Sequence, residues 1–253
     1  MFENHQKFNK WLNILLKKFS YLRQIQFAFN CLPIDPKVFA CLQTNCLYLE
    51  TIRFRKCIFS GITPEVLDSF GRKCGQTLRG LGFESCVWRG STPEDGILTY
   101  QELDQLLLTL LKRTTALKQF YYHSEPIRFL WHNYIRLFIT SSVDLLMSLT
   151  DINITYGIDY QSIDEFSRKY SKQMKTICLT LNTNDFNTNT DHLNKTLKLI
   201  STYESLESLS LTLTIKHKNR EKQYLIDEGL DQMSDNLKNL RKFELNLFTN
   251  QMK

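Results

Sequence analysis

Several features that would place this chain in a special structural class are missing from its sequence. The 253 residues include only 9 Gly and 5 Pro, which excludes collagen-like and low-complexity structure. No run reaches the roughly 18 apolar residues of a transmembrane helix, so we expect no membrane partner. Residues 1–27 contain neither an uninterrupted apolar core nor a small-residue cleavage site, and so predict no secretory signal. We therefore expect the chain to act in the cytoplasm or the nucleus.

Motifs for catalysis and for metal binding are also missing. The chain has no GxSxG, GxxxxGK[ST], HExxH or GxGxxG motif, and its five His residues are scattered. The seven Cys residues form no CxxC motif, and the nearest pair, Cys41 and Cys46, lacks the spacing of a zinc site. We expect free thiols in a reducing compartment, no catalytic residue, no metal, no cofactor and no enzymatic activity.

The composition is that of a globular protein with an uneven charge. Hydrophobic residues make up 42% of the chain and charged residues 23%, so an ordinary folded core is expected. The formal net charge of +6 lies wholly in residues 1–149, because residues 150–253 hold as many acidic as basic side chains. An excess of positive charge on one part of a protein favours an acidic partner.

The main positive feature is an internal repeat. Leu49–Cys57 and Leu78–Cys86 both follow the pattern L-x-x-L-x-L-x-x-C. Looser copies begin at residues 22, 117, 149, 174, 206 and 240, which makes eight copies at spacings of 25 to 39 residues. The L-x-L part alternates with period two, so each copy predicts a short strand whose apolar side chains share one face. The closing Cys or Asn is expected to be buried at the bend that leaves the strand.

The segments between the copies carry helix-start signals and helical apolar spacing. Asp35 is the expected N-cap with Pro36 at the first helical position, and Thr63 with Pro64 repeats that arrangement, as does Thr92-Pro93. Expected helices cover residues 35–44, the segment from 63, and residues 100–113, 127–148, 163–173, 192–203 and 225–237. The expected inward residues are Val38, Phe39 and Leu42, then Val66, Leu67 and Phe70. The N-terminal segment carries one apolar helical stripe, formed by Phe8, Trp11, Leu12, Leu15, Leu16 and Phe19.

A strand and then a helix, repeated along one axis, predict an α/β leucine-rich-repeat solenoid of about eight irregular repeats. Such a solenoid is a curved horseshoe with a parallel sheet on the concave face and helices on the convex face. Residues 1–21 are expected to form a capping helix or a partial repeat, and residues 22–253 the repeat domain.

Residues 46–86 resemble the cysteine-containing class of leucine-rich repeat. Cys46 to Cys57, followed by Gly61-Ile62-Thr63 and Val66-Leu67, is similar to the pattern C-x-x-L-x-x-L-x-L-x-x-C followed by I-T and a helix. This class is best known from F-box proteins, in which the repeats hold substrates for a cullin-type ubiquitin ligase. The resemblance implies a substrate-recognition role. The 21 residues before Leu22 leave no room for a three-helix F-box, so ligase subunits would be recruited by a missing segment.

Residues that flank the strand leucines are expected on the concave face, which we predict to bind a protein partner. Arg and Tyr combine contact area with directional bonding, so they are the favoured anchors. The predicted partner-binding residues are Arg53, Arg55, Glu84, Gln119, Tyr121, His123, Asp151 and Asn153.

Three other interpretations stay open at this point. In the first, the polar residues on the predicted concave face are merely solvated and bind no partner. In the second, the chain is a stand-alone scaffold without a ligase link. The third is a nucleic-acid binder, which is disfavoured because no recognised binding module accompanies the basic residues. Those basic residues are Arg53, Arg55, Lys56, Arg72, Lys73 and Arg79.

Overall fold

The structure is a computed structural model of the whole chain, and it describes residues 2–28, 33–90, 96–123, 146–155, 160–182, 190–216 and 227–250. The chain divides into two compact units. Unit 1 comprises Met1–Ser124 with Asp144–Ser148, and unit 2 comprises Glu125–Val143 with Leu149–Lys253. The expected signals at Thr92-Pro93-Glu94 and most of the expected helix 127–148 lie outside the described residues.

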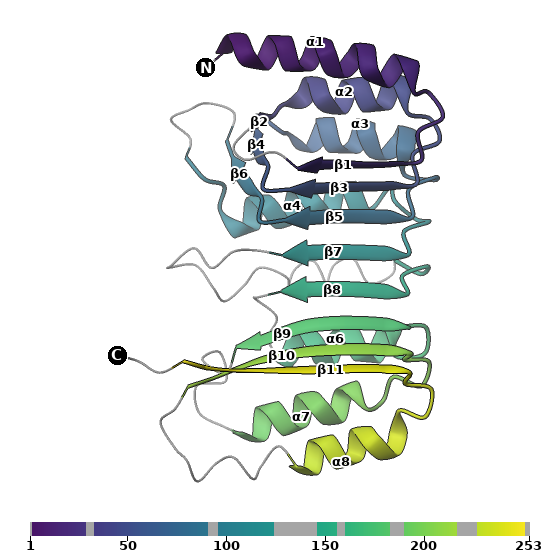
Figure 1. Cartoon of the computed structure of the whole chain (residues 1–253), viewed down its shortest axis with the longest axis vertical. Coiled ribbons are helices and arrows are strands. Elements are labelled where there is room, and N and C mark those ends of the chain that lie inside the picture. Colours follow the sequence, from purple (N-terminus) through teal and green to yellow (C-terminus); the bar gives the residue numbers. More distant parts are fainter. Residues whose placement is uncertain are drawn as a thin grey trace. The chain divides into compact units, whose positions relative to one another are not determined.

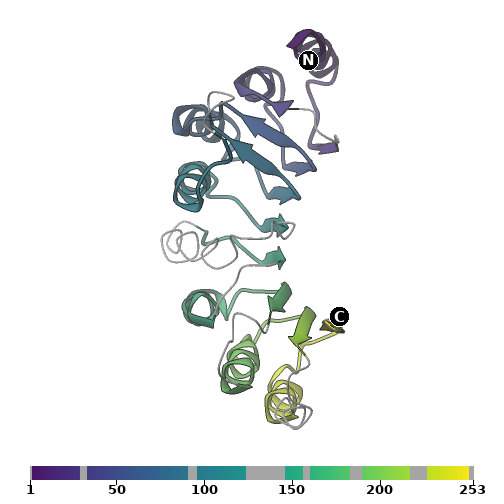
Figure 2. The same cartoon turned by 90° about the vertical axis from the view of Figure 1, so that its left-hand side faces the viewer.

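Unit 1 is a parallel sheet with helices along one side (Figures 1 and 2). Its four long strands pair in the order β1-β3-β5-β7, and every pair is parallel. A helix follows each of the first three strands, so consecutive strand–helix units lie side by side. The strands are β1 (Gln24–Ala28), β3 (Thr51–Arg55), β5 (Gly80–Glu84) and β7 (Gln119–His123), and the helices are α1 (Phe2–Lys18), α2 (Pro36–Asn45), α3 (Pro64–Cys74) and α4 (Tyr100–Leu111).

Unit 2 repeats this plan. Its four strands pair in parallel in the order β8-β9-β10-β11, and three helices lie on one side of them (Figure 2). The strands are β8 (Asp151–Thr155), β9 (Thr176–Asn182), β10 (Ser208–Lys216) and β11 (Lys242–Asn250), and the helices are α6 (Tyr160–Tyr170), α7 (Thr190–Ile200) and α8 (Asp227–Asn236). All eight predicted strands are therefore present, and the prediction of an α/β fold with parallel strands is confirmed.

A second, smaller sheet in unit 1 was not expected from the sequence. Three short strands, β2 (Pro33–Ile34), β4 (Ile58–Ser60) and β6 (Val87–Arg89), pair in parallel directly after the long strands. The ring of Phe59 stacks on that of Trp88, with centroids 3.9 Å apart. These strands are too short to show an alternation of apolar and polar residues in the sequence. Each one immediately follows a copy of the repeat, so the register of the long strands carries over to them.

Identical register brings equivalent side chains of neighbouring strands into contact. Phe27, Phe54 and Phe83 occupy matched positions on β1, β3 and β5. Their rings form a stack, with centroid distances of 5.3 and 5.7 Å and nearly parallel planes. Phe39 of α2 packs against the middle ring. A single strand with its helix would leave these rings in water, so the apolar burial that stabilises the fold requires the neighbouring strands and helices.

The bends that follow β3 and β5 are held by backbone and thiol hydrogen bonds. Lys56 and Ser85 adopt positive φ angles of 54° and 51°. The Lys56 amide donates to the Glu84 carbonyl, at 2.7 Å. The Cys86 thiol donates to the Phe54 carbonyl of the preceding strand, at 3.3 Å. Cys57 is fully buried at the equivalent position, as expected, whereas Cys86 is only half-buried.

The structure confirms Asp35 as the N-cap of α2 but does not confirm Thr63 as a hydrogen-bonding cap of α3. The Asp35 carboxylate accepts from the amides of Lys37 and Val38, at 2.9 and 3.3 Å, which makes it the expected N-cap of α2. Thr63 precedes α3 as expected but makes no capping hydrogen bond. Its side chain instead forms a hydrogen bond with that of Glu65, which lowers the pKa of the Glu65 carboxyl.

The helices show one overlooked capping signal and one corrected expectation. Thr99 begins α4 with a capping box, in which its hydroxyl accepts from the Glu102 amide, and the T-x-x-E signal for it was overlooked in the sequence. Val66 is half-buried rather than inward, because the face of α3 that packs inward is formed by Leu67, Phe70, Gly71 and Cys74.

Helix α1 packs against α2 with only part of its expected apolar stripe. Leu12 and Leu16 are buried, with exposed fractions of 2% and 1%. Trp11 and Phe19 are more than half exposed, so the predicted stripe is only partly buried. None of the helices in the described part of the chain is both long and apolar enough to span a membrane.

The phenylalanine stack leads to a stability prediction. Phe54→Ala removes the ring that touches both neighbours and leaves a cavity, so we expect a loss of about 3–5 kcal/mol in the free energy of unfolding. Urea denaturation followed by circular dichroism measures it. Met147→Ala, at a side chain that is 71% exposed, is the control and should change the free energy little. An equal effect of both substitutions would contradict the role of the stack.

A buried carboxyl on α4 predicts a pH dependence. Asp104 is 4% exposed, and its Oδ2 has no hydrogen-bond partner among the described residues. Burial raises the pKa of the Asp104 carboxyl to about 7. The folded chain thus binds more protons than the unfolded chain between pH of about 4 and 7, so stability falls as the pH rises through that window.

Asp104→Asn should remove this cost. We expect it to raise the free energy of unfolding at pH 8 by on the order of 1–4 kcal/mol, with a gain that shrinks as the pH approaches about 4. Denaturation curves at several pH values test this, with the exposed Asp231→Asn as the control. A gain that is independent of pH would rule out the explanation.

Candidate functional site

The outward face of the four long strands in unit 1 carries six of the eight predicted partner-binding residues. Side chains alternate along each strand, so the apolar set faces the helices and the intervening set faces away. We call the outward set the strand face of unit 1. It consists of Gln24, Gln26 and Ala28 on β1, Thr51, Arg53 and Arg55 on β3, Gly80, Gly82 and Glu84 on β5, and Gln119, Tyr121 and His123 on β7.

The parallel register arranges this face in rows that run across the strands. Arg53, Gly82 and Tyr121 form the central row. Gly82 has no side chain, so nothing separates the residues on either side of it. The Arg53 guanidinium carbon lies over the Tyr121 ring, 4.2 Å from its centroid. A cation over an aromatic face is attracted to it, by about 0.5–1 kcal/mol at an exposed site.

Glycine at position 82 leaves room for this contact, and a side chain there would be crowded. A Cβ placed on Gly82 would lie 3.2 Å from the Arg53 Cγ and 3.3 Å from the Tyr121 Cβ, which is tighter than ordinary packing. Gly80 lies in a similar position, because a Cβ placed on it would lie 3.0 Å from the Thr51 Cγ2 and Oγ1. Both glycines flank strand leucines in the repeat, and the predicted binding residues did not include them. Glycine inside a strand pattern signals the close approach of another group, and that signal was available.

The two arginines of the face differ in what they contact. The Arg55 Nε lies 3.0 Å from the Glu84 Oε1, in the row next to the Arg53 row. Arg53 forms no ion pair with any carboxylate of the described residues, and its guanidinium contacts the Tyr121 ring instead. The positive charge of Arg55 is therefore already matched, whereas that of Arg53 is available to an incoming anion.

Gln119 and His123 complete the predicted set on β7. Both side chains are half-buried. His123 lies in the row of Arg55 and Glu84, and its carbonyl accepts from the Ser85 amide at 2.7 Å. These two residues lie on either side of Tyr121 along β7, so together with it they form the part of the site that β7 contributes.

Asp151 and Asn153 belong to unit 2 and form a separate set. Both are half-buried on β8. The Thr150 hydroxyl donates to the Asp151 Oδ2 at 2.7 Å, so this carboxylate is partly satisfied. Asn153 lies in the row of Cys178, Ser210 and Glu244.

Cys178 has no environment that would activate its thiol. Burial is the main cause that raises its pKa, and the nearby Glu244 carboxylate raises it further. A nucleophilic cysteine needs a lowered pKa or an adjacent base. The described residues also contain no cluster of three or more His, Cys, Asp or Glu side chains that could hold a metal ion.

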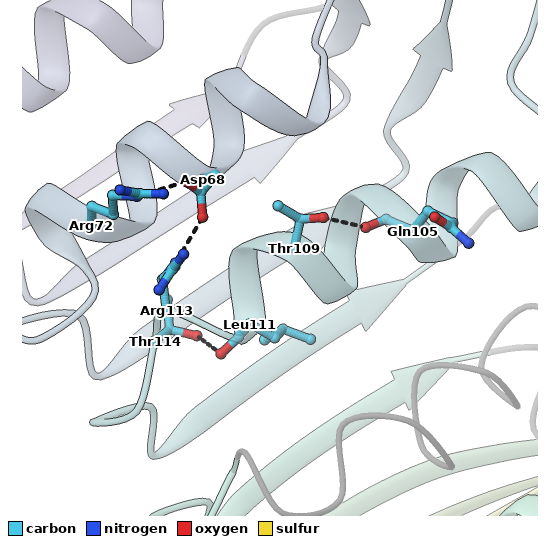
Figure 3. Close-up of polar contacts among 7 residues, drawn as sticks. All are labelled: Asp68, Arg72, Gln105, Thr109, Leu111, Arg113 and Thr114. Atoms are coloured by element: carbon cyan, nitrogen blue, oxygen red, sulfur yellow. Dashed lines mark hydrogen bonds and ion pairs between the residues drawn. The ribbon is translucent and has the colours of Figure 1, made fainter.

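The basic cluster expected from the sequence is divided between two sides of unit 1. Arg53 and Arg55 lie on the strand face, whereas Arg72 lies on α3, on the helix side. There the Asp68 carboxylate accepts from the Arg72 Nε and from the Arg113 Nε, each at 2.7 Å (Figure 3). Arg113 and then Arg72 lower the pKa of the Asp68 carboxyl. Arg72 is therefore separated from Arg53 and Arg55 by the sheet.

The network around Asp68 joins two helices. Arg113 follows α4 and Asp68 lies on α3, so their ion pair ties the two together (Figure 3). Gly71 and Gly75 allow the close approach, because a Cβ on Gly71 would lie 2.5 Å from the Arg113 Cβ. The single Asp68 carboxylate pairs with both arginines, so the cluster links α3 to α4 and keeps an excess of positive charge.

Comparison with known proteins adds no assignment to this geometry. No protein-family model matches the chain, and no curated protein sequence matches it.

Gly82 provides a direct test of the central row. Gly82→Val should displace the Arg53 or the Tyr121 side chain, because its branched Cβ would occupy the space between them. Valine is favoured in strands, so the fold should be retained. In NMR spectra of the ring protons of Tyr121, we expect the contact with the Arg53 side chain to disappear in the variant. Persistence of this contact would contradict the arrangement.

Proposed function

We propose that the chain is a leucine-rich-repeat solenoid that recognises a protein partner through the strand face of unit 1. The fold proposal is supported by the eight copies of the repeat and by parallel strands that pair in chain order within each unit. It is also supported by the equivalent bends at Lys56 and Ser85, and by the cysteines that follow them. In this proposal the protein binds its partner without catalysing a reaction, in the cytoplasm or the nucleus.

The observation that carries the recognition proposal is the Arg53 guanidinium held over the Tyr121 ring. The ring restrains the arginine in advance of binding, so less side-chain entropy is lost when a partner binds. The guanidinium has no described carboxylate partner, and it can donate paired hydrogen bonds to a planar anion. An acidic segment of a protein, with an Asp or Glu side chain that reaches Arg53, is the partner that this chemistry favours.

The resemblance of residues 46–86 to cysteine-containing repeats suggests a more specific role. We propose that the strand face holds a substrate for an F-box-type ubiquitin ligase, and that ligase subunits are recruited outside this face. A stand-alone scaffold that uses the same face is the alternative. A nucleic-acid partner is less well supported, because the basic residues are divided between two sides of unit 1.

Two matched substitutions test the site. Arg53→Ala should weaken partner binding by roughly 10- to 100-fold, a typical loss at a central interface anchor. Arg55→Ala should change it less than about threefold, because an exposed ion pair such as Arg55–Glu84 contributes little. Quantitative affinity capture from the source cell extract, followed by mass spectrometry, gives the comparison. Equal losses for both variants would contradict the distinction between the two arginines.

The same capture separates the proposed roles when it includes Arg53→Glu/Tyr121→Ala. Lys73→Glu, an exposed lysine on α3, is the control. Ligase adaptor or cullin subunits retained by all forms, together with a protein lost only from the double variant, support the receptor role. Partners without ligase subunits indicate a scaffold. Binding that falls steeply with salt and is competed by unrelated DNA or RNA would replace the protein-recognition proposal.

A further inference from the structure

The outer side of α1 carries an exposed ridge that the strand-face proposal does not use. Lys7, Trp11, Ile14 and Lys18 are spaced by four, three and four residues, which sets them on one stripe of the helix. Trp11 is 55% exposed and Ile14 is 49% exposed. The opposite stripe, with Leu12, is packed against α2, so this ridge faces away from the rest of unit 1.

Apolar side chains gather at this end of unit 1. Nine large apolar side chains in the described part of the chain are exposed, and six of them lie in residues 11–48. Near the C-terminal end of α1 the rings of Tyr21 and Tyr48 stack, with centroids 5.5 Å apart. Clustered exposed apolar residues mark interaction surfaces, whereas single ones do not. The six residues are Trp11, Ile14, Phe19, Tyr21, Leu47 and Tyr48.

The charged side chains on the ridge and on the adjacent side of α1, at Lys10 and Lys17, are of one sign. Lys7, Lys10, Lys17 and Lys18 are all exposed on α1. None of them forms an ion pair with a carboxylate of the described residues, although Arg23, just beyond the helix, is paired with Glu50 at 2.9 Å. Helical spacing sets Lys7 and Lys18 at the two ends of the Trp11–Ile14 stripe, and Lys10 and Lys17 along one side of it. This arrangement favours a partner that is apolar along its centre and acidic at its ends and along one edge.

We propose that the α1 ridge binds an acidic amphipathic helix of a partner protein. In unit 1, α1 packs on α2, α2 on α3 and α3 on α4, so a helix placed on α1 would continue the same side-by-side packing. An amphipathic helix presents an apolar stripe at the spacing of Trp11 and Ile14. Glutamate or aspartate beside that stripe would reach the four lysines. This surface is distinct from the strand face of unit 1 and does not depend on it.

Charge and shape disfavour two other occupants. A second copy of the chain, paired through the same ridge, would bring eight lysines together, because a twofold interface places each residue set against itself. A bilayer would receive only a shallow contact from α1, since the most apolar stripe of the helix, with Leu12 and Leu16, is already buried against α2.

The test uses the intact chain and two synthetic peptides of about 18 residues, enough for a five-turn helix. One peptide has a leucine stripe flanked by glutamates, and its twin has lysines in place of the glutamates. The ridge variants are Trp11→Ala/Ile14→Ser and Lys10→Glu/Lys17→Glu, all at surface positions. The control is Lys37→Glu/Lys73→Glu, which makes the same charge change on α2 and α3. Fluorescence anisotropy of the labelled peptides measures binding.

We expect the glutamate peptide to bind at least about tenfold more tightly than the lysine peptide. Each ridge variant should lose at least about tenfold in affinity, and the control should lose less than about twofold. Binding of the glutamate peptide that is unchanged in the ridge variants would overturn the proposal.

Two further measurements examine the other occupants. Co-sedimentation with phosphatidylcholine vesicles that contain about one-third phosphatidylserine tests the bilayer. Sedimentation velocity tests self-association. Vesicle binding lost in the ridge variants would overturn the helix proposal in favour of a membrane, and dimerisation lost in them would overturn it in favour of a second copy. The absence of both effects, with peptide binding as expected, supports it.

Discussion

The shared register of neighbouring strands is the constraint on which the rest of unit 1 depends. It sets Phe27, Phe54 and Phe83 ring on ring inside the sheet, and it sets Arg53, Gly82 and Tyr121 side by side outside it. The stability of the core and the geometry of the strand face are therefore consequences of one alignment. A slip of one residue would exchange the two faces, burying Arg53 and exposing Phe54.

This coupling explains why residues at the bends are constrained as strictly as those in the core. Lys56 and Ser85 take up left-handed backbone conformations that cost a non-glycine residue roughly 1 kcal/mol. In return their amides bond to carbonyls of the next strand, and the following cysteines bond back to the preceding one. Each bend thus locks the position of its strand relative to both neighbours. The short strands β4 and β6 begin directly after these bends, so the second sheet inherits the same register.

The sequence predicted the parts of the fold that arise from local periodicity. The L-x-L alternation located all eight long strands, and Asp35 with Pro36 located the start of α2. Helix α1 was foreseen, but not which of its apolar residues would be buried. That depends on where α2 packs, and residues such as Trp11 are exposed because α2 covers only one stripe. The sheet β2-β4-β6 has no periodic signal of its own.

The strand face was predicted in composition but not in its pairing. Aligning the copies that begin at Leu49 and Leu78 places Arg55 beside Glu84 and Arg53 beside Gly82. The alignment does not say that the Arg53 side chain crosses the glycine to reach Tyr121, because that depends on side-chain conformation. Two arginines that are equivalent in the sequence therefore differ in the structure, and only one offers an unmatched charge on this face.

The two proposed surfaces of unit 1 differ in position and in the type of group they favour. The strand face lies on the side of the sheet opposite α2, α3 and α4, whereas the α1 ridge extends their row of helices (Figure 2). The first offers a single guanidinium over a ring, suited to one carboxylate in an extended segment. The second offers an apolar stripe between lysines, suited to a whole helix. The two proposed surfaces share no residue, so a partner at one would not compete for the side chains of the other. Taken together, the two proposals describe unit 1 as a support for two partners of different shape.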